Sequence, residues 1–130
     1  MSRMRALVLL SAVTVLLSAC GGGRSHKEVL GVTLREYQEL TEFLKLIESE
    51  DDAKRLRPHI RPAVNRIVDL TEELESLGAV PAENKAEVAE LQRQLEGAIK
   101  ACQNQVRRAS RINGVSEALA CLERLPQSTE

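Results

Sequence analysis

The chain contains no tryptophan, and its 130 residues include only one tyrosine and one phenylalanine. Proteins that bind single-stranded nucleic acid stack the bases on aromatic side chains, and these two residues are too few to form such a platform. The formal net charge of −1 also gives no general attraction to phosphates. The sequence therefore predicts no nucleic-acid partner.

Residues that carry catalysis are equally scarce. The histidines are His26 and His59, and the patterns HExxH, Cys-x-x-Cys and Gly-x-Ser-x-Gly do not occur. A zinc site needs three or four ligands, usually His or Cys, and the sequence has no such grouping. We therefore expect no catalytic residue, no metal site and no cofactor.

The N-terminal segment has the layout of a secretory signal. Arg3 and Arg5 precede an apolar run over residues 6–17, which is broken by only two hydroxyl residues and followed by small side chains. A membrane-spanning helix needs about 20 apolar residues, so this run is too short to cross a bilayer comfortably. We expect residues 1–19 to be a signal peptide that is removed.

The end of this segment reads Leu17-Ser18-Ala19-Cys20 and resembles the lipobox of bacterial lipoproteins. The resemblance implies cleavage between Ala19 and Cys20, a diacylglycerol on the Cys20 thiol and acylation of the new amine. Two or three acyl chains anchor a protein stably in a membrane, whereas one chain does so only marginally. The alternative is a plain secretory signal in which Cys20 is an ordinary thiol.

The residues after Cys20 bear on location. In this family, an Asp directly after the cysteine retains the protein in the inner membrane, and here that position is Gly21. The resemblance thus implies a lipid-anchored protein of the cell envelope, in the outer membrane facing the periplasm. Three glycines and polar residues follow, so we expect a flexible tether over residues 20–32.

Apolar residues then recur every three or four positions, which predicts amphipathic helices and no strand. We expect a first helix over residues 33–50, capped by Thr33 with Glu36 in a capping box. A second apolar stripe covers residues 51–77. Pro58 and Pro62 interrupt it, so we expect a kink, or a short helical turn followed by a long helix starting near Pro58.

Two breakers divide the remaining chain. Gly78 and Pro81 predict a tight turn before a helix over residues 81–112. Asn113-Gly114 predicts a second turn, with Ser116 capping a short helix that closes at Pro126. Short connections make neighbouring helices antiparallel. The prediction is an all-α, antiparallel up-down bundle over residues 33–126, with three main helices, a short C-terminal helix and a tail at 127–130.

This layout is similar to that of small helical lipoproteins of uncharacterised function. The similarity lies in the segment LTEFLKLIESEDDAKRLRPHIRPAVNRIVDLTEELESLGAVPAENKAEVAELQRQLEGAI. A helix is followed by a proline-bearing helix, a Leu-rich turn and a third long helix. The resemblance implies a helical bundle and brings no activity.

Cys102 and Cys121 remain after Cys20 is assigned to the anchor. A secreted protein works in a compartment that oxidises thiols, and an even number of cysteines favours pairing. We therefore expect a disulfide between them. The alternative is two free cysteines that act as small core residues.

Antiparallel pairing of the second and third helices also gathers cations at one end of the bundle. Helix dipoles and solubility explain much of this charge. A sharper hypothesis is an end that binds anionic envelope lipid or cell-wall polymer. We expect a protein that acts by binding or scaffolding, or else as an accessory or inhibitor subunit of an envelope enzyme. The anionic-ligand candidates are Lys54, Arg55, Arg57, Arg61, Arg107, Arg108 and Arg111.

Overall fold

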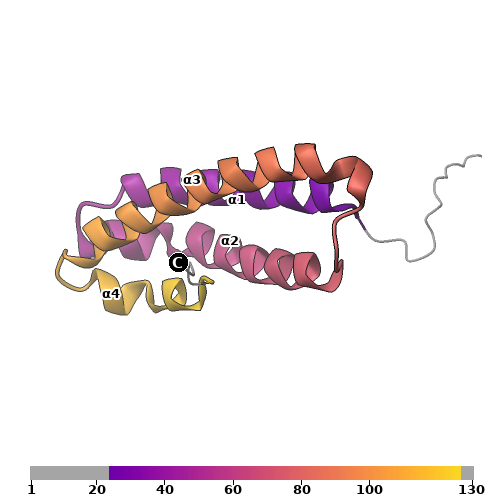
Figure 1. Ribbon diagram of the computed structural model, residues 1–130. Helices are drawn as coiled ribbons and strands as arrows, with labels where there is room; N and C mark the ends of the chain where they lie inside the picture. Colours follow the sequence, from indigo (N-terminus) through magenta and orange to yellow (C-terminus); the bar gives the residue numbers. More distant parts are fainter. Residues whose placement is uncertain (1–23, 127–130) are drawn as a thin grey trace, which may run out of the picture.

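The computed structural model describes residues 24–126, and they form an all-α bundle with no strand among them (Figure 1). The predicted fold class is therefore confirmed. The predicted signal peptide, the anchor Cys20 and the tail at 127–130 lie outside the described residues. The elements are α1 (His26–Lys45), α2 (Glu50–Ser76), a 3-10 turn (Ala82–Asn84), α3 (Lys85–Ser110), α4 (Val115–Ala118) and a second 3-10 turn (Ala120–Arg124).

Helix α1 begins at His26, seven residues before the predicted start at Thr33. The Ser25 hydroxyl accepts a hydrogen bond from the backbone N–H of Glu28 at 3.2 Å, and the Glu28 carboxylate accepts one from the Ser25 N–H at 2.9 Å. This capping box satisfies two N–H groups that would otherwise lack partners. Thr33 is instead buried inside the helix, where its hydroxyl donates to the Val29 carbonyl at 2.7 Å. The predicted cap is wrong, and the predicted tether is helical from residue 26.

Helix α1 ends at Lys45, and α2 begins at Glu50 with Ser49 as its cap. The Ser49 hydroxyl accepts from the Asp52 N–H at 3.1 Å. The first helix therefore ends before the expected boundary at 50–51, because residues 46–49 form the turn between the two helices. The start of the second helix is close to that boundary.

Pro58 and Pro62 do not divide α2, which continues as one helix through both. A proline frees the carbonyl four residues earlier, which then needs another partner. Both prolines are exposed, so solvent can supply it. The expected separate helical turn ahead of Pro58 is therefore wrong.

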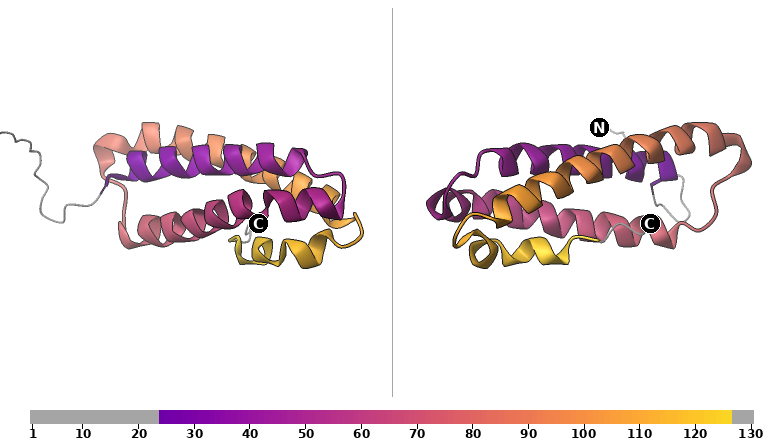
Figure 2. Two further views of the ribbon diagram at one scale, coloured as in Figure 1. Left: turned by 180° about the vertical axis from the view of Figure 1, so that it is seen from behind. Right: turned by 60° about the vertical axis from the view of Figure 1, so that its left-hand side comes forward.

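Helix α1 lies between the other two long helices (Figure 2). Its backbone approaches α2 and α3 closely, whereas α2 and α3 hardly approach each other. The short C-terminal elements pack on α2, and α4 also contacts α3. The fully buried large side chains include Leu30, Leu40, Leu44, Ile47, Ile60, Ile67, Val88 and Leu119.

Two glycines with positive φ mark the later turns. Gly78 has φ 73° and Gly114 has φ 83°, a region that residues with a Cβ rarely adopt. Gly114, and not Ser116, occupies the position that precedes α4. The predicted final helix is also shorter than expected, since one α-helical turn is followed by a 3-10 turn. Helix α3 starts at Lys85, after the 3-10 turn that follows Pro81.

Candidate functional site

The first residues of the fold make three polar contacts, one each with the end of α2, the turn after it and the start of α3, which we call the N-terminal clamp. Each contact joins side chains or backbone groups at least 49 positions apart in the chain. The Arg24 guanidinium meets the Glu73 carboxylate with Nε–Oε2 at 3.1 Å and Nη2–Oε1 at 2.6 Å, the His26 Nε2 lies 3.0 Å from the Gly78 carbonyl oxygen, and the Lys27 ammonium donates to Glu87 at 2.8 Å.

The clamp was missed at the level of sequence, because residues 24–27 had the composition of a tether. Its detectable signal was Ser25 followed three residues later by Glu28, which is a helix-start pattern. Exposed ion pairs contribute at most about 1 kcal/mol each. The clamp therefore adds little stability, but it determines which end of the bundle receives the chain from Cys20.

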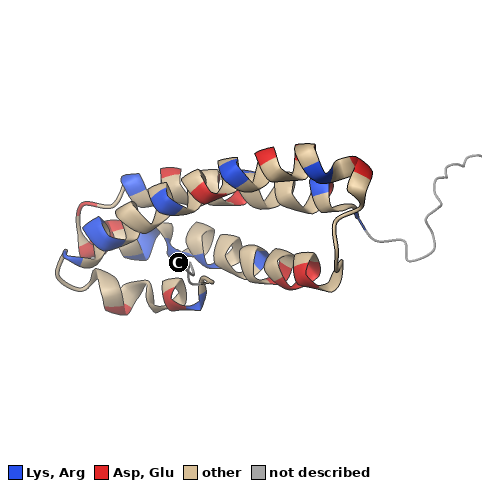
Figure 3. Ribbon diagram, in the orientation of Figure 1, with Lys and Arg blue, Asp and Glu red and all other residues tan. Residues whose placement is uncertain are grey.

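The seven predicted anionic-ligand residues have different surroundings, and two of them are neutralised. Lys54 pairs with Glu50 at 3.2 Å, and Arg55 pairs with Asp52 at 3.1 Å. Both pairs lie within the first turns of α2. Figure 3 accordingly shows both signs of charge at this end of the bundle, and not a basic surface alone.

Two more of the candidates hold helices together. Arg108 donates through Nη1 to the Ile47 carbonyl at 3.0 Å and through Nη2 to the Leu44 carbonyl at 2.8 Å. Arg57 donates to the Ala118 carbonyl at 3.4 Å. The last carbonyls of a helix have no partner within the helix, so Arg108 completes the C-terminus of α1. These two side chains have structural roles.

Like Arg57 and Arg108, the remaining three candidates have no carboxylate within ion-pair distance in the described part of the chain: Arg61, Arg107 and Arg111. Arg107 contacts the Asn104 side-chain oxygen. Arg61 lies on α2, Arg107 in the last turn of α3 and Arg111 directly after that helix, and the backbones of α2 and α3 hardly approach each other. The structure thus engages four of the seven residues in ion pairs or backbone contacts and leaves Arg61, Arg107 and Arg111 exposed.

The two described cysteines are free thiols that both belong to the core of the bundle. Cys102 is 1% exposed, and burial raises the pKa of its thiol to about 11, while the Thr41 hydroxyl lowers it in part. Cys121 is partly buried and packs against the same core cluster. The disulfide is not formed in the structure, and the pairing stays a prediction.

Two shallow grooves flank α1. One, of about 380 Å³, lies against α3 and is floored by the small residues Ala98 and Ala101. The other, of about 210 Å³, lies against α2, where the Glu36 Oε1 is 3.0 Å from the Arg66 Nε but is not aligned for a hydrogen bond. Neither groove is lined by a histidine or a cysteine.

Neither histidine is in a catalytic setting. His26 belongs to the clamp, and His59 is stacked on Phe43 with ring centroids 5.3 Å apart. Within residues 24–126, no group of three or more His, Cys, Asp or Glu side chains could hold a metal ion. No helix in that range is long and apolar enough to cross a membrane. The chain matches no known protein family, no curated protein and no solved structure.

Proposed function

We propose that the protein is a bacterial lipoprotein, anchored through acyl chains on Cys20, whose bundle acts in the cell envelope by binding or scaffolding. The observation that carries the proposal is the lipobox Leu17-Ser18-Ala19-Cys20 behind a positively charged lead. The bundle begins a few residues later and has its own core between Val29 and Leu122. A membrane anchor therefore leads directly into a folded domain.

The proposal assigns no reaction to the bundle. Its histidines are engaged by a backbone carbonyl and by an aromatic ring, and the two grooves beside α1 are shallow. Binding of another envelope component needs only a rigid surface, which three packed helices provide. Gly21, in the position where Asp would retain a lipoprotein in the inner membrane, supports an outer-membrane location facing the periplasm.

Intact mass of the protein extracted from bacterial membranes tests the anchor, with Cys20→Ser as the matched variant. Loss of residues 1–19 together with the mass of acyl chains is expected for the wild type and not for the variant. Membrane fractionation of the same samples then tests the location. An unmodified Cys20 in the wild type would overturn the proposal and leave a secreted bundle.

We also propose that Cys102 and Cys121 pair in the oxidising envelope. Both belong to one core region, and Cys121 lies in the 3-10 turn that closes the described fold. Alkylation of the denatured, unreduced protein tests this. Failure of both thiols to react without a reductant is expected, whereas reaction of both would show two free cysteines.

A second candidate function is binding of an anionic envelope component through Arg107 and Arg111. These exposed side chains stand four residues apart at the C-terminal end of α3, with Arg111 directly after the helix, and have no carboxylate partner among the described residues. The double variant Arg107→Glu, Arg111→Glu should abolish binding to anionic vesicles or to isolated cell wall. Arg108 must be left intact, because it completes α1.

A further inference from the structure

We propose that the α2–α3 turn is the surface of this protein that contacts the lipid headgroups of its own membrane, so that the bundle stands upright with its opposite end exposed. The inference rests on the proposed acylation of Cys20. It concerns residues 77–86 of the turn and the adjacent start of α1, which we call the anchored end.

The connection between Cys20 and the bundle is short. Arg24 is held by Glu73, so four steps along the chain separate Cys20 from the first clamped residue. Consecutive Cα atoms are about 3.8 Å apart, so these four steps span at most about 15 Å. The anchored end must therefore lie within about 15 Å of the acylated cysteine.

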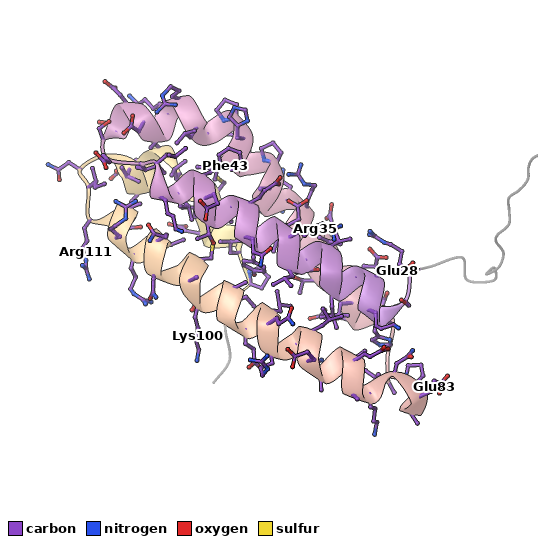
Figure 4. All side chains as sticks on the ribbon, turned by 90° about the horizontal axis from the view of Figure 1, so that it is seen from above. Glu28, Arg35, Phe43, Glu83, Lys100 and Arg111 are labelled. Atoms are coloured by element: carbon purple, nitrogen blue, oxygen red, sulfur yellow. The ribbon has the colours of Figure 1, made fainter. Side chains whose placement is uncertain are left out.

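The N-terminal clamp shows where the chain enters the bundle. Arg24, His26 and Lys27 each contact the C-terminal part of α2, the turn after it, or α3, so the chain enters the fold beside that turn. Ser25 caps α1 immediately after Arg24, so the helix cannot unwind to lengthen the tether without losing its cap. Figure 4 shows Glu28 and Glu83 at this end of the bundle and Arg111 at the other.

The bundle is long compared with the connection to Cys20. Helix α2 has 27 residues and is thus about 40 Å long, which is more than twice the reach of the tether. The far end can touch the same bilayer only if the bundle lies on its side. A protein that lies in the interface needs an apolar face. Leu46, at the far end, is the only large apolar side chain that is strongly exposed in the described part, at 57%.

The exposed side chains of the anchored end are compatible with contact to lipid headgroups. Its exposed centre is small and uncharged, with Ala79, Pro81 and Ala82. Charged side chains of both signs surround it, with Lys27 and Lys85 among the cations and a larger number of carboxylates, including Glu28, Glu75 and Glu83. Zwitterionic lipids present phosphate and ammonium groups together, so each sign of charge has a counterpart, whereas an acidic end alone would be repelled by an anionic surface.

The chain has no tryptophan, so a single introduced tryptophan is a unique fluorescent probe. The acylated full-length mature protein is reconstituted in phosphatidylcholine and phosphatidylethanolamine vesicles that contain a headgroup-attached quencher. Ala82→Trp reports the anchored end and Asn113→Trp the far end. The exposed positions Arg35→Trp, Arg61→Trp and Lys100→Trp report the sides of α1, α2 and α3.

The expected result is quenching of Ala82→Trp several-fold above that of Asn113→Trp, with each side probe below Ala82→Trp. A side probe quenched as strongly as Ala82→Trp would overturn the upright orientation, and strong quenching of Asn113→Trp would indicate lipid binding by the far end. A long Gly/Ser insertion between Gly23 and Arg24 leaves the bundle unchanged and should reduce the contrast between the two ends.

The measurements distinguish an incorrect upright orientation from the absence of the Cys20 anchor. If the mass of the protein shows no acyl chain and the protein does not float with vesicles, both proposals fall together. If the protein is acylated and floats, but its probes are quenched equally, the anchor stands and only the orientation is wrong.

Discussion

Arg108 donates through Nη2 to the carbonyl oxygen of Leu44 at 2.8 Å and thereby joins the last turn of α3 to the last turn of α1. A second bond runs from Nη1 to the Ile47 carbonyl at 3.0 Å. Because the C-terminus of a helix is the negative end of its dipole, the guanidinium charge is also favourable there. One side chain thus adds a charged donor to the Leu44 carbonyl, which also accepts from the Ile47 N–H at 3.1 Å, and provides a partner for the Ile47 carbonyl.

Replacing Arg108 by Gln should lower the free energy of unfolding by about 2 kcal/mol, since hydrogen bonds from a charged donor contribute about 1.5–3 kcal/mol. Arg107→Gln is the control, because Arg107 is exposed and contacts only the side chain of Asn104. Urea unfolding of both variants measures the difference. Equal stability of the two variants would contradict the assigned role of Arg108.

Ser25→Ala should destabilise the protein by about 1 kcal/mol, because it removes the hydroxyl that caps α1. Ser116→Ala is the matched control: its hydroxyl makes only one long contact, 3.5 Å from the Ser110 carbonyl oxygen. That exposed serine should tolerate the change to within about 0.5 kcal/mol. Thermal unfolding compares the two, and a larger loss at Ser116 would mean that the caps are assigned incorrectly.

The periodicity of apolar residues was enough to predict three long helices, because burial of one face is a property of each helix alone. The residues at which the helices begin and end were harder to predict. Ser25 and Thr33 both begin an S/T-x-x-E pattern, and only the burial of Val29 and Leu30 decides between them. That burial depends on α2 and α3, which local sequence does not describe.

The surroundings of the candidate cations were hard to predict for a related reason. The sequence shows that Arg57 and Arg108 are cations, but not that the carbonyls of Ala118 and Leu44 lie within their reach. It also suggested that α2 and α3 are close neighbours, whereas their backbones hardly approach each other and α1 contacts both. Which charges meet follows from helix order in space, and three helices of similar length allow more than one order.

Gly97→Ala should stabilise the protein by about 0.5–1 kcal/mol, because Gly97 lies inside α3 and a Cβ there meets nothing within 4 Å. Gly114→Ala should do the opposite. Its φ is 83°, so a residue with a Cβ is strained there, and the exposed Glu50 side chain would also have to move aside. Chemical unfolding of each variant should give changes of opposite sign, and a stabilised Gly114→Ala would contradict the geometry of this turn.

Alkaline pH should weaken the fold through Cys102. Burial raises the pKa of its thiol from 9.0 to about 11, so the native state holds the proton more tightly than the unfolded chain does. The resulting stabilisation is complete below about pH 9 and is lost as the pH rises through about 11. Tyr37, whose pKa burial raises from 10.0 to about 12, adds a loss of the same sign at higher pH.

Comparison of wild type with Cys102→Ala removes the thiol, together with the smaller part of the Tyr37 pKa shift that the Cys102 charge causes, while the burial of Tyr37 is common to both proteins. Under reducing conditions, the stability difference between the two proteins should shift by about 2 kcal/mol against the wild type between pH 8 and about pH 10.5. Urea unfolding at several pH values measures it. A difference that stays constant with pH would show that Cys102 ionises equally in the folded and unfolded chains, which its burial in the core does not permit.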